Sequence, residues 1–85
     1  MTTRLRADVV FTELDDGSVL LDERTGRYYQ LNTTATLALR TMLDGGSPHH
    51  AAEVLADRYD TSHRRASADI VGLITRLRRL ELVTP

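Results

Sequence analysis

The feature that most constrains this chain is a stretch over residues 18–32 that reads as a hairpin and ends by starting a helix. Residues 19–21 and 27–31 are short apolar runs, the second with two adjacent tyrosines, and both suit strands. The loop of residues 23–26 between them ends in a glycine, which can adopt a positive φ at little cost. Asn32 is a good helix N-cap because its side-chain oxygen can accept a hydrogen bond from a first-turn amide. The sequence therefore predicts a strand that leads directly into a helix.

A further strand is expected before the hairpin. Residues 8–14 carry β-branched and aromatic side chains, and Asp15–Ser18 reads as a turn in which Gly17 can take a positive φ. Three strands joined by short turns form an antiparallel meander. The third strand, residues 27–31, is then left at an edge of the sheet.

Three helices are expected after the strands. The first spans Thr33 to Leu43, where apolar residues recur at helical spacing. The second begins with Ser47 as N-cap and a proline at the first helical position, and the third follows a cap at residue 61 or 62 and runs to about Leu80. The inward face of the second helix is predicted to hold Ala51, Ala52, Leu55 and Tyr59. The apolar stripe of the third is predicted to hold Ala66, Ile70, Leu73, Leu77 and Leu80, widened by Ile74. Strands followed by helices indicate an α+β fold like a winged helix-turn-helix: a three-stranded antiparallel sheet and then three helices.

Composition narrows the class of protein. A length of 85 residues predicts one domain over residues 1–85. The chain has no cysteine, which excludes disulfides and thiolate metal sites. Its net charge of −1 gives the whole molecule no strong field for nucleic acid. With no export signal and no run of transmembrane length, we expect a cytoplasmic protein that does not enter a membrane.

Residues suited to catalysis are scarce. The chain contains no cysteine nucleophile, nucleophile elbow, phosphate-binding loop or zinc-protease pair. His49 and His50 are adjacent, so on a helix they point about 100° apart, and their spacing to His63 does not complete a metal site. We therefore expect no enzyme activity, no metal and no cofactor.

Three further features allow a structural or a functional interpretation. Tyr28 and Tyr29 must point to opposite faces of their strand, so one can pack under the helices while the other is left outside, where it could line a groove. Arg64 and Arg65 oppose the dipole of the third helix by roughly 0.3–1 kcal/mol each, and we favour solvated side chains over an anion contact. Gly72 costs roughly 1 kcal/mol relative to alanine in a helix interior, and it marks either a close approach by another backbone or a tolerated substitution.

The most specific motif of the chain is the run Gly26-Arg-Tyr-Tyr-Gln-Leu-Asn-Thr-Thr34, accompanied by the helix end at Leu43-Asp-Gly45 and by residues 52–59. On these motifs the chain resembles the PqqD-like family. The resemblance extends from about residue 10 to residue 83. Two departures are Ala35, where glycine is usual, and Leu39, where tryptophan is usual. We interpret both positions as structural.

The resemblance implies a peptide-binding module, the recognition element of ribosomally made and modified peptides (RiPPs). Such a domain binds the leader segment of a precursor and acts as a peptide chaperone that presents it to processing enzymes. A free-standing form this short looks most like the leader-binding subunit of lasso peptide biosynthesis, a route to antibiotics. Its partners would be a separate leader peptidase and possibly a cyclase. In this family the leader adds as a strand beside the third strand, in a groove that the third helix closes.

The residues themselves favour the same mode of binding. An unprotected edge strand carries unpaired N–H and C=O groups and invites strand addition. The third helix could face the added strand with the border of Asp69, Leu73, Arg76 and Leu80, or with that of Ser67, Val71, Ile74 and Arg78. We favour the first border because Asp69 and Arg76 offer both charges beside an apolar strip. The predicted peptide-binding residues are Arg27, Tyr28, Tyr29, Gln30, Leu31, Asp69, Leu73, Arg76 and Leu77, with Leu73 and Leu77 as an apolar floor.

Two other interpretations use the same elements differently. In a winged-helix DNA-binding regulator, the third helix would read DNA while Arg64 and Arg65 contact phosphates. Against this stands the net charge of −1, because such domains usually carry a basic footprint. A scaffold or dimerisation domain would use the open strand edge for a second protein chain.

Overall fold

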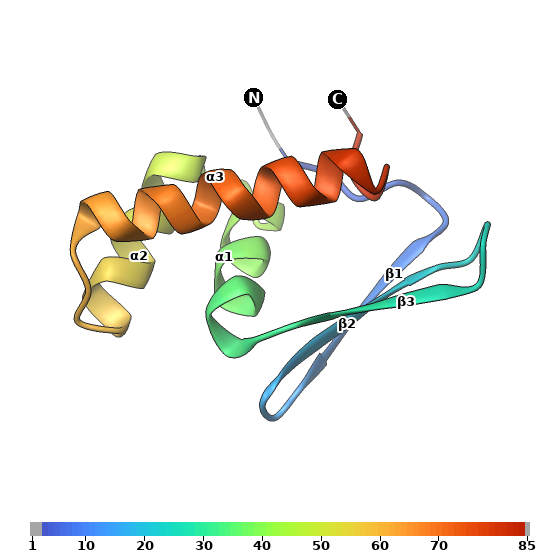
Figure 1. The fold of residues 1–85 in the computed structure, drawn as a ribbon, viewed down its shortest axis with the longest axis horizontal. Helices are drawn as coiled ribbons and strands as arrows, with labels where there is room; N and C mark the ends of the chain where they lie inside the picture. Colours follow the sequence, from blue (N-terminus) through green and yellow to red (C-terminus); the bar gives the residue numbers. More distant parts are fainter. Residues whose placement is uncertain (1–2, 85) are drawn as a thin grey trace.

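The computed structural model describes residues 3–84, and its elements follow the predicted order (Figure 1). The strands are β1 (Val9–Leu14), β2 (Gly17–Asp22) and β3 (Arg27–Leu31), and the helices are α1 (Thr33–Leu43), α2 (Pro48–Arg58) and α3 (His63–Arg79). The sheet is antiparallel with the order β1-β2-β3, so β3 lies at an edge. The predicted α+β architecture, a three-stranded sheet followed by three helices, is confirmed.

Each helix begins at a polar residue that caps it. The side chains of Asn32, Ser47 and Ser62 accept a hydrogen bond from the amide three residues further on, at N···O distances of 2.8, 3.0 and 3.1 Å. A cap of this kind is worth about 1 kcal/mol because it satisfies an amide that has no partner within the helix. Of the two candidates at the start of α3, Ser62 is the cap. The strand-to-helix junction at Asn32 fixes where α1 leaves the sheet.

The pairing register separates the sheet into a core face and an outer face. Leu20 pairs with Phe11 on β1 and with Tyr29 on β3, and residues paired in this way share one face. Leu20 is fully buried and Tyr29 is half-buried against the core. Tyr28 belongs to the opposite face and is 69% exposed. The two tyrosines therefore divide as expected, one under the helices and one outside.

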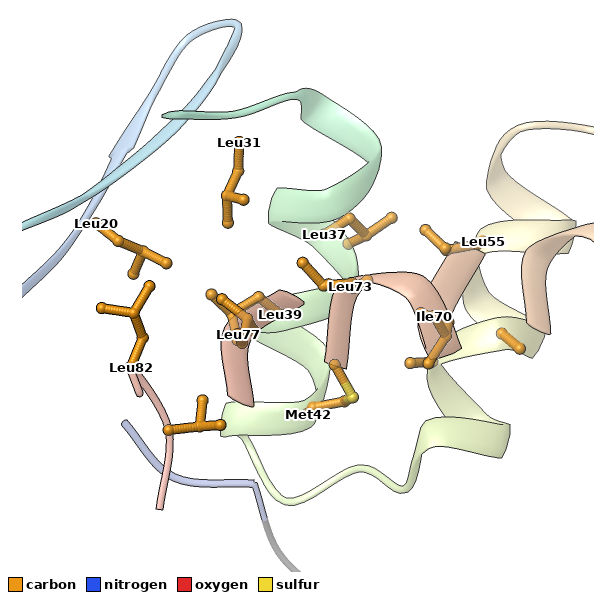
Figure 2. Packing of buried hydrophobic residues seen from close by; sticks show 14 of the residues in the cluster. Leu20, Leu31, Leu37, Leu39, Met42, Leu55, Ile70, Leu73, Leu77 and Leu82 are labelled. Carbon is orange, nitrogen blue, oxygen red and sulfur yellow. The ribbon is translucent and has the colours of Figure 1, made fainter. Parts of the chain in front are cut away.

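Helix α1 packs against the sheet and against both other helices, and α3 passes over α1 (Figure 1). Leucines from the sheet, α1 and α3 point into one interior (Figure 2). The predicted stripe of α3 is buried at Ala66, Ile70, Leu73 and Leu77 and half-buried at Ile74 and Leu80. The prediction for Tyr59 is wrong: it is the C-cap of α2 and 43% exposed. The chain turns away there through Asp60, whose φ is 50°, so the inward face of α2 ends with Leu55.

A buried carboxylate fastens the hairpin loop. Asp22 is 2% exposed, and its two oxygens accept from Arg24 Nε and Nη2 at 3.2 and 3.1 Å. These hydrogen bonds hold the pKa of Asp22 below its ordinary value, although burial acts in the opposite direction. Arg24 Nη2 also donates to the Glu81 carbonyl at 3.2 Å. The loop between β2 and β3 is thereby joined to the segment that follows α3.

The two ends of the described chain lie side by side. Leu5 and Val83 form an antiparallel bridge, and the Thr84 amide donates to the Arg4 carbonyl at 2.9 Å. Val83 is buried in the core cluster, and Leu5 packs against that cluster. No helix within residues 3–84 is long and apolar enough to cross a membrane.

Candidate functional site

The open edge of β3 is the first component of the site. Within residues 3–84, β3 pairs with β2 alone, so its other edge has no strand beside it. Arg27, Tyr28 and Gln30 are exposed, whereas Leu31 is buried at the end that leads into α1. In an antiparallel strand every second residue directs its N–H and C=O groups to one edge. The β3 edge can therefore pair with an extended chain.

A pocket of about 620 Å³ adjoins the C-terminal end of this strand. Its walls are the end of β3, the first turns of α1 and the middle of α3, and Leu55 of α2 closes it at depth. The volume lies within the range of about 300–1,000 Å³ that is usual for ligand sites. The wall of α1 holds Ala35 and Ala38, whose small side chains leave the space between β3 and α3 open. The pocket is thus a continuation of the open strand edge.

Five of the predicted residues come together in this pocket. Gln30 and Leu31 line it from β3, and Asp69, Leu73 and Arg76 line it from α3. These α3 residues belong to the border of the helix that the sequence favoured. The other border, at residues 67, 71, 74 and 78, contributes no residue to the pocket lining.

The other four predicted residues lie outside the pocket lining. Arg27, Tyr28 and Tyr29 occupy the hairpin end of β3, where they stand along the open edge. Leu77 is only 1% exposed and belongs to the core. The contact of these four residues with a bound peptide stays a prediction.

Small residues on two helices form part of the pocket that the sequence did not indicate. Ala35 and Ala38 line it from α1, and Ala68 and Gly72 line it from α3. Ala35, for which the sequence predicts a structural role, also forms part of the wall. Leu39, the other departure from the family pattern, is fully buried in the core. The unfavourable helix propensity of Gly72 marks it as unusual in the sequence. The sequence does not show, however, which elements surround it.

The rim of the pocket carries one charge of each sign. Asp69 and Arg76 are exposed and stand about two turns apart on α3. In the described part of the chain, the ion pairs join Arg24 to two aspartates, Arg40 to Glu13 and two histidines to Glu53, and neither rim residue takes part. Both rim charges are available to a ligand.

The histidines form a separate surface group. The rings of His49 and His63 lie 4.8 Å apart and are tilted, and Glu53 Oε1 lies 3.9 Å from His49 and from His50. Among residues 3–84 no group of three or more His, Cys, Asp or Glu side chains is arranged to hold a metal. Arg64 and Arg65 are exposed at the start of α3.

Comparison with known proteins gives one family and two solved structures. The sequence model of the family described as coenzyme PQQ synthesis protein D (PqqD) matches residues 17–83. The structure described as lasso peptide synthetase B1 complexed with the leader peptide is similar over the full length of both chains, with 39% identity and a TM-score of 0.92. The complex of TbiB1 with the TbiA(beta) leader peptide covers 94% of this chain and 93% of its own, with 22% identity and a TM-score of 0.85, a likeness of fold. No curated protein matches the chain.

Proposed function

The chain belongs to the PqqD family, and from this premise we propose that it binds the leader segment of a lasso-type precursor peptide by strand addition. It is a RiPP recognition element of the stand-alone kind, like the lasso peptide synthetase B1 to which it is 39% identical. One observation carries the proposal: the open edge of β3 runs into a pocket that α3 bounds on the opposite side.

The geometry supports different roles for the main chain and the side chains of the leader. A leader strand beside residues 27–31 would exchange main-chain hydrogen bonds with β3, which supply affinity for almost any extended sequence. Its alternate side chains would point toward the helices and enter the pocket above Leu73. Asp69 and Arg76 would then contact polar groups of the leader at the rim. Selectivity would come from the pocket and the rim.

We assign the peptide site to the residues of both components. Arg27, Tyr28, Tyr29, Gln30 and Leu31 form the strand side, and Asp69, Leu73, Arg76 and Leu77 form the helix side. Leu77 supports Leu73 from within the core rather than from the pocket surface. Residues 1–85 act as one recognition domain.

The protein carries no chemistry of its own in this proposal. It delivers the bound precursor to a separate leader peptidase and possibly to a cyclase, while the segment to be processed stays outside the groove. Because ribosomes release such precursors into the cytoplasm, the protein acts there. It needs no metal or cofactor to bind a leader.

Fluorescence polarisation tests the binding directly. The probes are fluorescein-labelled copies of two leaders: the one bound by the 39% identical synthetase B1, and this chain's own cognate leader. We expect a dissociation constant in the micromolar range or tighter, no binding of a scrambled peptide, and no binding of nonspecific duplex DNA. Tight binding of the duplex without binding of either leader would favour the DNA-binding interpretation instead.

Amide hydrogen exchange tests the mode of binding. Every second amide of β3 faces the open edge, so a strand added there should slow exchange at alternate residues within 27–31. Amides of β1, on the far edge of the sheet, serve as the internal control. Protection confined to α2 or to β1 would contradict strand addition at β3.

A further inference from the structure

Gly72 occupies an unusual place in the structure. It lies in the interior of the longest helix, α3, and lines the pocket together with Asp69, Leu73 and Arg76. Glycine is less favourable than alanine in a helix interior because it loses more backbone freedom on folding. A structural reason for its presence can come from backbone conformation, from packing or from a ligand.

Backbone conformation and packing within the chain do not supply that reason. Gly72 is not among the glycines with positive φ, which are Gly17, Gly26 and Gly45. Apart from its two chain neighbours and the adjoining backbone of α3 itself, a β-carbon built on Gly72 meets no atom of the described residues within 4 Å. At Gly17, by contrast, a β-carbon would collide with the Leu31 carbonyl oxygen. The space in front of Gly72 is open, and it opens into the pocket.

We infer that Gly72 determines which leaders the protein accepts, because its missing β-carbon leaves room for a bulky leader side chain to lie against the α3 backbone. This inference rests on the proposed function. The main chain of a leader strand would stay in the plane of the sheet, beside β3, and only its side chains would extend toward the helix layer. Ala35 and Ala38 face the same space from α1 and give the side chain an apolar surface. The ligand group is thus a large apolar side chain at one register position of the leader.

The test combines variants of the protein with variants of the leader. Gly72→Ala and Gly72→Leu are compared with the wild type by thermal melting and by fluorescence polarisation with the two labelled leaders named above. The leaders are also made as sets in which each bulky apolar residue in turn is replaced by alanine. Val71→Leu, on the adjacent exposed position outside the pocket, is the matched control.

The expected result separates folding from recognition. Gly72→Ala should melt several degrees higher than the wild type, since it restores helix propensity without a clash. Gly72→Leu should bind the unmodified leader roughly tenfold or more weakly, because its side chain fills the space that the leader needs. For one of the alanine-substituted leaders, Gly72→Leu should bind as tightly as the wild type does, because that leader lacks the bulky side chain that needs the space. Val71→Leu should bind all leaders as the wild type does.

Three outcomes overturn these statements. If the wild type binds a leader and Gly72→Leu binds every peptide of the set as tightly as the wild type does, the inference about Gly72 is wrong and the proposed function stands. The inference is also wrong if Gly72→Leu weakens all peptides by the same factor. If the wild type binds neither leader, the proposed function fails and the inference fails with it.

Discussion

The hydroxyl oxygens of Ser18 and Thr36 lie 2.7 Å apart, both buried, and this hydrogen bond ties β2 to the first turns of α1. Thr36 Oγ1 also donates to the Asn32 carbonyl at 2.8 Å, so the Ser18 hydroxyl is the donor of the shared bond. Thr36 is the neighbour of Ala35, which forms part of the pocket wall. The tie between strand and helix therefore sets the position of that wall.

Removing the two hydroxyls should have unequal effects. Thr36→Val leaves the Ser18 hydroxyl buried without an acceptor, which we expect to cost about 1–3 kcal/mol of unfolding free energy. Ser18→Ala leaves the bond from Thr36 to Asn32 intact and should cost about 1 kcal/mol. The double variant should be no less stable than Thr36→Val alone, as urea denaturation can measure. Strict additivity of the two losses would contradict the coupling.

The rim charges should contribute to leader binding and little to stability. Asp69→Ala and Arg76→Ala each remove an exposed charge that forms no ion pair within residues 3–84, so melting temperatures should stay close to that of the wild type. Leader affinity, from fluorescence polarisation, should fall by about two- to tenfold for each variant. Val71→Ala and Arg78→Ala, on the other border of α3, are the controls. Loss of affinity in the controls alone would mean that the leader contacts that border instead.

A proline on the open strand should disturb the main-chain pairing. Gln30→Pro removes one amide hydrogen from β3, and proline cannot donate to a strand ladder. We expect leader binding to weaken by tenfold or more, about 1.4 kcal/mol. Gln30→Ala, which keeps the amide and shortens the side chain, should lose clearly less affinity than Gln30→Pro. A folded Gln30→Pro variant, judged by its melting curve, with unchanged affinity would argue against strand addition at this position.

The Asp22–Arg24 pair predicts a specific dependence of stability on pH. The pKa of Asp22 is lowered in the folded state, first of all by its side-chain hydrogen bonds from Arg24. A group with a lowered folded pKa stabilises the fold above its unfolded pKa, and that contribution is lost as pH falls below about 4, through the folded pKa. Asp22→Asn should therefore melt lower than the wild type at pH 7, and the difference should narrow as the pH is lowered toward 2. A constant difference across this range would exclude the carboxylate charge as the cause.

The protein alone should leave a precursor peptide unchanged. Incubation of the purified protein with the full precursor, followed by mass spectrometry, should return the starting mass. Addition of a leader peptidase should then yield cleavage, faster with this protein present than without it. Cleavage or modification by the protein alone would show a chemistry that the proposed function does not contain.

Much of the fold followed from signals close together in the sequence. The caps at Asn32 and Ser47 and the hairpin loop ending at Gly26 each depend on a few neighbouring residues, and the edge position of β3 follows from the short turns that join consecutive strands. Tyr59 was misplaced because helical spacing continues past the point where α2 ends.

The site was only partly predictable, because it forms where elements that are far apart in the sequence come together. The border of α3 with Asp69 and Arg76 could be favoured on charge alone, and it does line the pocket. The wall at Ala35 and Ala38 could not be foreseen, since an alanine on a helix looks the same whether it faces a core or an opening. The link from Arg24 to the Glu81 carbonyl likewise joins segments far apart in the chain.

The adjacency of Arg4 and Thr84 means that the chain can be cut and rejoined in a different order. A linker of a few residues would close the hydrogen-bonded ends, and new ends could be opened at Gly45, in the exposed turn between α1 and α2. Such a circular permutant would keep β3, α1 and α3 covalently intact, with the same pocket between them. The pocket is thus independent of where the polypeptide starts, and a processing enzyme could be fused at the new ends without interrupting the elements that form it.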